Sequence, residues 1–271
     1  DGAQQQTAIG FRGLVPETAP DAPRVPLLEQ LAVQHRAMAG TVQWLMASRR
    51  VPPRIVPYPA APRWRIQPDG SDACTVLAFH RDILTDVSHW YHGTLGRVLD
   101  VLDVPPGNFR TVLRNLRRAD FDIDLIDTGE GMVQVLPVLV ALELARRQAD
   151  GGPSILAIEE PESHLHPDLQ RALAEHTCAV LRQTPGARVV FETHSEHLLL
   201  AIQLQVARGE LAPEDVLVYW VRQLDDGQSI ADPVRFDAEA RPQGHWPPDV
   251  FTGDDTLARE ILRARRERQR P

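Results

Sequence analysis

The chain contains no lysine, and all 29 of its basic residues are arginines. It therefore lacks a phosphate-binding loop of the G-x-x-x-x-G-K-[ST] type, in which the lysine contacts the phosphates. Cysteine is almost as scarce, because only Cys74 and Cys178 occur and they lie far apart in the sequence. Two such residues predict neither a disulfide framework nor a paired-cysteine metal site.

Long apolar runs are also missing. No run approaches the roughly 20 residues of a membrane-spanning helix, and no segment resembles a signal peptide. The 271 residues suffice for one large domain or two small ones. We expect a soluble, cytoplasmic protein with no membrane partner. Because the sequence begins with Asp1, we also expect a piece of a longer chain or a processed product.

The net charge of −8 argues against a protein whose whole surface binds nucleic acid. Only the tail over residues 263–270 is strongly basic. An arginine-rich face of this kind is most often solvated, and contact with a phosphate backbone is the minority interpretation. Nucleic acid therefore stays open as a partner.

The chemically interesting residues lie between positions 154 and 197. Two short apolar runs, over 155–158 and 188–191, predict buried strands, and the apolar spacing over 167–182 predicts a helix between them. A strand, helix and strand in this order form a parallel crossover unit. The acids and histidines that follow each run would then share the carboxyl edge of the sheet, where open α/β sheets bind ligands.

Patterns elsewhere predict further elements in chain order. The N-terminal half is expected to hold a polar tether over 1–24, an amphipathic helix over 27–46, a proline-rich linker over 51–64, a short helix ending at Phe79, helices over 83–102 and 108–118, and a half-buried strand over 119–127. The C-terminal half is expected to hold an apolar helix over 132–147, a helix over 196–208 opened by a Thr193 and Glu196 capping box, a buried strand over 216–221, a hairpin at Asp226-Gly227, a strand over 229–236 and a helix over 256–268.

A metallohydrolase is one interpretation of the acids and histidines. His164 and His166, with nearby carboxylates, are ligand types that zinc accepts. However, the chain has no H-E-x-x-H motif, and His194 and His197 lack the glutamate placement of that motif. The spacing therefore argues against this class.

A nucleoside triphosphatase accounts for more of these residues. Glu159, at the end of a buried strand, can hold Mg²⁺, which keeps several waters and needs only one or two carboxylates. Glu160 beside it points in another direction and can orient and deprotonate an attacking water. Adjacent acids after a buried run are costly without a cation, which favours this interpretation over a plain strand end. His194, at the neighbouring strand end, can stabilise the γ-phosphate.

The segment around Gly129 has two interpretations that stay open. Gly129 and Gly131 follow Thr128 at a helix start, where exposed backbone N–H groups can bind an anion. Alternatively, Asp127 and Thr128 only cap that helix, because capping uses the same N–H geometry.

Three motifs together resemble the ABC-type ATPase heads of the OLD, RecF and SMC-like group within the AAA ATPases. LIDTGEGMVQVLPVL (125–139) resembles their signature motif, ILAIEEPESHLHP (155–167) their Walker B and D-loop, and FETHSEHLL (191–199) their switch histidine. VYWVRQLDDGQSIADPVRFD (218–237), followed by WPPDVF, is similar to a C-terminal domain of unknown function found in such ATPases. The resemblance covers about residue 51 to the end and suggests the C-terminal half of a head.

This resemblance implies an α/β, P-loop NTPase-like C-terminal lobe with a helical insertion and a small C-terminal hairpin and helix extension. The implied domains are 1–66 (tether, helix and linker), 67–126 (helical subdomain leading to a strand), 127–222 (ATPase lobe) and 223–271 (small C-terminal domain).

The resemblance also assigns roles. Glu159 would bind magnesium, Glu160 would be the general base and His194 the switch histidine. The remaining implied contacts with nucleotide lie in the signature and the D-loop, the latter crossing a dimer interface: Thr128, Gly129, Glu130, Gly131, Ser163 and His164. The sequence departs from the family where Walker B ends in Glu rather than Asp, and where TGEG replaces SGGQ.

The implied cofactors are ATP and Mg²⁺, and the implied partners are a second head in a dimer and an N-terminal Walker A half, from a longer parent or a separate polypeptide. Such ATPases often act in phage defence or DNA repair beside a nuclease effector. The competing hypothesis is a non-catalytic, ATPase-like interaction module that docks a nuclease or another effector.

Overall fold

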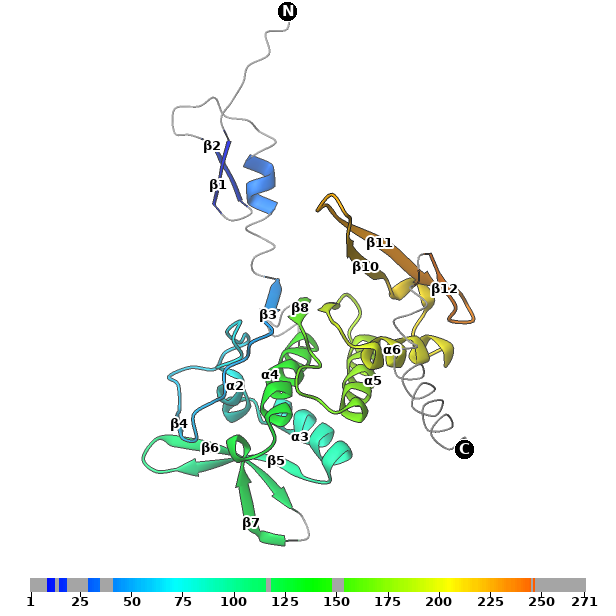
Figure 1. Cartoon of the computed structure of the whole chain (residues 1–271). Coiled ribbons are helices and arrows are strands. Elements are labelled where there is room, and N and C mark those ends of the chain that lie inside the picture. Colours follow the sequence, from blue (N-terminus) through cyan, green and yellow to red (C-terminus); the bar gives the residue numbers. More distant parts are fainter. Residues whose placement is uncertain are drawn as a thin grey trace, which may run out of the picture. The chain divides into compact units, whose positions relative to one another are not determined.

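The computed structural model describes residues 9–12, 15–18, 29–34, 41–115, 118–147, 154–244 and 246. It divides into two compact units (Figure 1). The first comprises Asp1–Ser163 and Thr184–Glu192, and the second comprises His164–Gln183 and Thr193–Pro271. Within the described ranges, no helix is long and apolar enough to cross a membrane.

A three-stranded parallel sheet organises the first unit. Its order is β3 (Val42–Leu45), β8 (Ile155–Glu159) and β9 (Arg188–Glu192), and Glu159 pairs with Glu192 at the last position of β8 and β9. Helix α5 (Pro167–Gln183) lies between β8 and β9 in the sequence. The predicted strand, helix and strand are therefore confirmed, and the carboxyl ends of the strands meet at one edge. The predicted burial of the second strand is wrong, because β9 alternates between exposed and partly buried residues and Val190 is 58% exposed.

Strand β3 corrects the predicted helix over 27–46. Residues 29–34 are helical, but Val42–Leu45 is a strand in register with β8. The buried Gln43 explains the change, because its side-chain amide donates to the Ile66 carbonyl at 2.9 Å and accepts from the Ile66 N–H at 3.1 Å. Pairing with distant parts of the chain thus outweighs the helical spacing.

Helix α4 (Glu130–Ala145) forms the core of the first unit. It packs against β3, β8, α2 (Ala73–Phe79) and α3 (Arg81–Leu95). Most of its residues are apolar and buried on all sides, with Gln134 and Glu143 as buried polar exceptions, and it contains Pro137. The backbone of Gly70 approaches Pro137 so closely that a Cβ at this position would lie 2.6 Å from the proline Cγ.

An antiparallel sheet replaces most of the predicted helical insertion. Its path is β4 (Val56–Pro57), β6 (Asn108–Asn115) and β5 (Val98–Val104), and β7 (Arg118–Asp124) also pairs with β6. The helices predicted over 83–102 and 108–118 are wrong in the parts that form β5 and β6. Gly96, with a left-handed φ of 66°, ends α3.

The predicted strand is confirmed as β7, but its predicted alternation is wrong, because Phe121 is 61% exposed while Asp122, Ile123 and Asp124 are all partly buried. The predicted proline-rich linker contains only the two-residue β4 as regular structure. In the predicted N-terminal tether, β1 (Ile9–Arg12) pairs antiparallel with β2 (Val15–Thr18).

The second unit joins two helices and a small sheet. Helix α5 packs against α6 (Glu196–Ala207), and the antiparallel sheet has the order β10 (Val218–Gln223), β11 (Ser229–Phe236) and β12 (Pro242–Gln243). The predicted hairpin and strand over 229–236 are confirmed.

Two predictions in the second unit are wrong. Ser195 rather than Thr193 caps α6, because its side chain accepts from the Leu198 N–H. The predicted buried strand over 216–221 corresponds to β10, on which Tyr219 and Val221 are 58% and 67% exposed. The helix predicted over 256–268 lies outside the described residues.

Both cysteine thiols are buried, and burial raises the pKa of Cys74 and of Cys178 to about 11. Because the thiolate is the reactive species, we expect DTNB at pH 8 to label the native chain far more slowly than the denaturant-unfolded chain. The thiols keep their protons to a higher pH in the folded chain, where their pKa is about 11, than in the unfolded chain, where it is 9.0. The free energy of unfolding should therefore fall as the pH rises from about 9 toward 11. Rapid labelling of both native thiols at pH 8 would contradict this burial.

Candidate functional site

Glu159 ends β8, and its side chain is held by the neighbouring strand β3 and the turn that follows it. The Trp44 indole Nε1–H donates to Glu159 Oε1 at 3.1 Å, and the Ala47 backbone N–H donates to Oε2 at 3.0 Å. Each carboxylate oxygen keeps a second lone pair for another ligand. The two donors therefore orient the carboxylate without saturating it.

Glu160 follows with an unusual backbone, because its φ is 40° and lies in the left-handed region. Its N–H donates to the Glu192 carbonyl at 2.8 Å, which ties it to the end of β9. The Ser163 hydroxyl donates to Glu160 Oε2 at 2.7 Å. The structure thus brings Glu159, Glu160 and Ser163 together, with the two adjacent carboxylates bonded to different partners.

Arg49, which is not among the predicted site residues, lies in the segment after β3 and is only 4% exposed. Its Nη2 donates to the carbonyls of Glu159 at 2.6 Å and Glu160 at 2.8 Å. Burial lowers the pKa of Arg49, while the charges of Glu162, Glu160 and Glu159 act in the opposite direction. A single arginine after a strand has no distinctive pattern, so its importance emerges only from the folded contacts.

The TGEG segment follows the 3₁₀ turn η1 (Leu125–Asp127) and runs into α4: Gly129 is the N-cap of α4, and Glu130 and Gly131 are its first two residues. The Thr128 hydroxyl donates to the Leu125 carbonyl at 2.6 Å, and the cap position makes no side-chain hydrogen bond. The Asp127 carboxylate instead forms a bidentate pair with Arg54 at 2.6 and 2.7 Å, which lowers the pKa of Asp127. Neither Thr128 nor Asp127 therefore caps α4 with its side chain.

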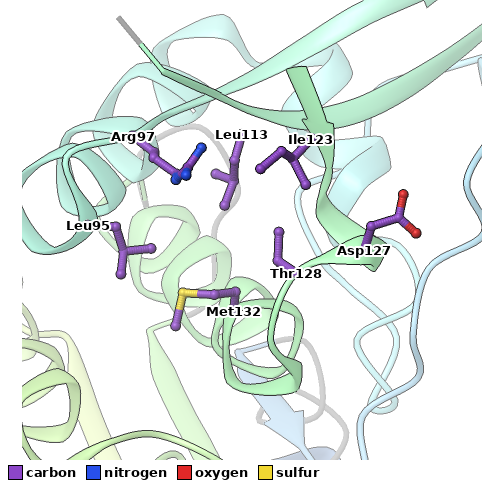
Figure 2. A pocket seen from close by; sticks show the side chains of 7 residues that line it. All are labelled: Leu95, Arg97, Leu113, Ile123, Asp127, Thr128 and Met132. Atoms are coloured by element: carbon purple, nitrogen blue, oxygen red, sulfur yellow. The ribbon is translucent and has the colours of Figure 1, made fainter. Parts of the chain in front are cut away.

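A cavity of about 290 Å³ opens beside the start of α4 (Figure 2). Its lining combines apolar side chains with three polar ones: Leu95, Arg97, Leu113, Ile123, Asp127, Thr128 and Met132. In Figure 2, the carboxylate of Asp127 points away from the other lining side chains. This places one predicted signature residue, Thr128, on the wall of a cavity within the first unit.

The predicted histidines belong to the second unit. His164 is exposed and has a φ of 63°, and His166 Nδ1 lies 3.5 Å from the Asp168 carboxylate. His194 is exposed and immediately precedes the cap residue of α6. The predicted residues are therefore divided, with Thr128 to Gly131, Glu159, Glu160 and Ser163 in the first unit and His164 and His194 in the second.

A protein-family model described as "AAA domain, putative AbiEii toxin, Type IV TA system" matches residues 31–201. The chain belongs to this AAA-domain family. The matched range runs through β3, α4, β8 and β9 and into α6. The parallel sheet of this mixed α/β chain is that of a P-loop NTPase-like fold. No curated protein matches the chain.

Solved structures of SMC ATPases are similar to this AAA domain. One, from work on ATP-driven dimerization and DNA-stimulated activation, shows 10% identity and a TM-score of 0.42, covering 60% of this chain and 90% of that one. An SMC head bound to the C-winged helix domain of ScpA shows 11% identity and a TM-score of 0.44, and the match covers 60% of this chain and 45% of that one. An SMC head with an extended coiled coil, from Pyrococcus furiosus and bound to the C-terminal domain of ScpA, shows 9% identity and a TM-score of 0.41. That match covers 70% of this chain and 40% of that one. The chain spans less than half the length of the last two.

The donor set of the AAA domain suits a hard cation. Among the described residues, no three His, Cys, Asp or Glu side chains converge to hold a metal ion. Mg²⁺ needs only one or two carboxylates, since it retains water and binds phosphate oxygens. The oriented but unsaturated carboxylate of Glu159, with Glu160 next to it, fits this requirement.

Proposed function

We propose that this AAA domain hydrolyses ATP at a composite dimer interface, as the C-terminal part of an ABC-type ATPase of the OLD-like branch. The observation that carries the proposal is the pair of adjacent carboxylates at the end of β8, each fixed by different hydrogen-bond donors. Two acids that differ in orientation can take different roles, one with a cation and one with a water. The phosphate-binding loop would come from an N-terminal half, because this chain has no lysine.

In this mechanism Glu159 would hold Mg²⁺, and the bound ion would neutralise charge on the phosphate oxygens. Glu160 orients the attacking water and accepts its proton, and the Ser163 hydroxyl fixes one of its carboxylate oxygens while the other stays available. His194 stabilises the charge that develops on the γ-phosphate.

The signature and the D-loop would act across the dimer. Gly129 is exposed at the start of α4, and the side chains before it are engaged elsewhere, which favours anion binding by the first-turn N–H groups over side-chain capping. Thr128, Glu130 and Gly131 would contribute to this contact with the opposite nucleotide. Ser163 and His164 would lie at the same interface.

The direct test combines the chain with the polypeptide that carries its G-x-x-x-x-G-K-[ST] loop and measures phosphate release from ATP with Mg²⁺. We expect turnover only when both parts are present. Chelation of Mg²⁺ should abolish it. Absence of both turnover and ATP-dependent dimerisation in the combined sample would support the alternative, a non-catalytic module that docks a nuclease or another effector.

The biological setting follows from the family resemblance alone. We propose a role in phage defence or a DNA-related process, with a nuclease as a candidate effector. Loss of protection against phage infection on deleting the coding region would support the first setting. Unchanged protection would contradict it.

A further inference from the structure

Arg49 is a buried cation in a place where packing alone would not require one. Burying a guanidinium is costly unless its donors are satisfied and its charge is balanced. Here only 4% of the residue is exposed, and three glutamates lie close enough to oppose the effect of burial on its pKa. Because burying this guanidinium costs free energy, we expect it to have a structural role toward the backbone groups that it contacts, such as holding them in a fixed position.

The first part of that role is to hold the peptide between Glu159 and Glu160. At one end of this peptide, the Glu159 carbonyl accepts from Arg49 Nη2 at 2.6 Å. At the other end, the Glu160 N–H donates to the Glu192 carbonyl at 2.8 Å. The peptide plane is therefore fixed from both sides.

The same arginine supports the strained backbone of Glu160. A non-glycine residue with a φ of 40° occupies a region that costs free energy and persists only when surrounding contacts hold it. Arg49 Nη2 also bonds the Glu160 carbonyl at 2.8 Å. This conformation sets the direction in which the Glu160 side chain leaves the sheet.

The second part of the role is a link to α4. The Gln134 side-chain amide donates to the Arg49 carbonyl at 3.0 Å, and Arg49 Nη1 donates back to the Gln134 carbonyl at 3.4 Å. Gln134 is 6% exposed and lies about one helical turn after Glu130, the first residue of α4. The buried Arg49 side chain therefore connects α4, which begins in TGEG, with the backbone carbonyls of Glu159 and Glu160.

We propose that Arg49 is a positioning residue that couples the TGEG end of α4 to the orientation of Glu160. This inference rests on the proposed function, because Glu160 is the general base only in that mechanism. A displacement of the first turn of α4, when its N–H groups meet an anion, passes through Gln134 and Arg49 to the peptide before Glu160. Anion contact in one subunit then adjusts the base of the same subunit.

The first test compares Arg49→Lys with Arg50→Lys in the combined, ATP-hydrolysing sample. Lysine keeps the charge but lacks the planar fork that reaches several carbonyls at once. Arg50 is the matched control, because its side chain is 72% exposed and its ion pair with Asp69 is long, at 4.0 Å. We expect Arg49→Lys to lower kcat roughly tenfold or more with KM for ATP nearly unchanged, as for a group that acts in the transition state. Arg50→Lys should leave both parameters at the wild-type values.

The second test uses the chain alone, so it does not depend on turnover. The Trp44 indole N–H, assigned by Trp44→Phe, reports in ¹H–¹⁵N NMR spectra on its bond to the Glu159 carboxylate. Arg49→Lys and Gln134→Leu should both shift this resonance, whereas Arg50→Lys should not. Gln134→Leu also serves if Arg49→Lys fails to fold, since it removes only the amide bond to Arg49.

The outcomes separate the two proposals. A wild-type sample that never hydrolyses ATP refutes the proposed function, and the indole shifts then decide whether the Arg49 link exists. Wild-type turnover with an unchanged kcat in Arg49→Lys and an unmoved Trp44 resonance overturns the coupling role. A rise in KM with kcat unchanged also overturns it, because this would indicate a role in nucleotide binding.

Discussion

Replacing Glu160 with glutamine is expected to lower ATP turnover by roughly 100-fold or more, the range in which loss of a general base falls. Glutamine preserves the size of the side chain and can still meet the Ser163 hydroxyl, but it cannot take a proton from water. ATP binding should persist, because the amide also removes a negative charge beside the phosphates. The measurement is single-turnover hydrolysis together with ATP-dependent dimerisation in the combined sample.

The matched control is Glu214→Gln, which makes the same chemical change at an exposed position in the 3₁₀ turn η3 (Pro213–Asp215). Its turnover should equal that of the wild type. If Glu160→Gln hydrolyses ATP at the wild-type rate, the general-base assignment is wrong. A variant that loses dimerisation as well as hydrolysis would instead assign Glu160 to binding.

Shortening Leu139 to alanine is expected to destabilise the chain by about 2–5 kcal/mol, the usual cost of a Leu-to-Ala change in a core. Leu139 is 0% exposed on α4, which packs against strands β3 and β8 and helices α2 and α3. The loss combines the transfer free energy of the missing methyl groups with a cavity that the surrounding elements fill only partly. Urea unfolding followed by circular dichroism measures the change.

Leu200→Ala is the control for this core prediction, because Leu200 is 42% exposed on α6. An exposed substitution should change the free energy of unfolding by no more than about 0.5 kcal/mol. Equal losses for the two variants would show that α4 is not the core of its unit. If the two units unfold in separate transitions, Leu139→Ala should shift the transition of the first unit, and Leu200→Ala should leave the transition of the second nearly unchanged.

The elements around the acids were predictable because their signals are local. Strands β8 and β9 are short apolar runs with clear boundaries, and α5 has regular helical spacing and begins at a proline. The glutamates could be placed at a sheet edge for the same reason. Their roles stay proposals, since the sequence does not reveal which donors hold each carboxylate.

The errors arose where apolar residues satisfy two periodicities. The run over 98–104 fits a helix continuing from α3, but Gly96 adopts a left-handed conformation and β5 then pairs with β6 over seven residue pairs. Residues 42–45 likewise fit a helix until β8 offers a partner strand. Local propensity is a weak guide where distant strands compete for the same residues.

The contacts of Arg49 could not be predicted from the residues around it in the sequence. Its neighbours Ser48 and Arg50 suggest an exposed turn, yet its guanidinium reaches carbonyls 110 and 111 positions away. Contacts of this kind depend on how β3, β8 and α4 come together. They become visible only in the folded chain.

The most direct measurement for the central claim is a structure of the combined sample with Mg²⁺ and a non-hydrolysable ATP analogue. We expect Glu159 beside the metal ion, Glu160 within hydrogen-bond distance of a water in line with the γ-phosphate, and His194 near that phosphate. Glu160 and His194 on opposite sides of the molecule, or a nucleotide bound away from the end of β8, would contradict it.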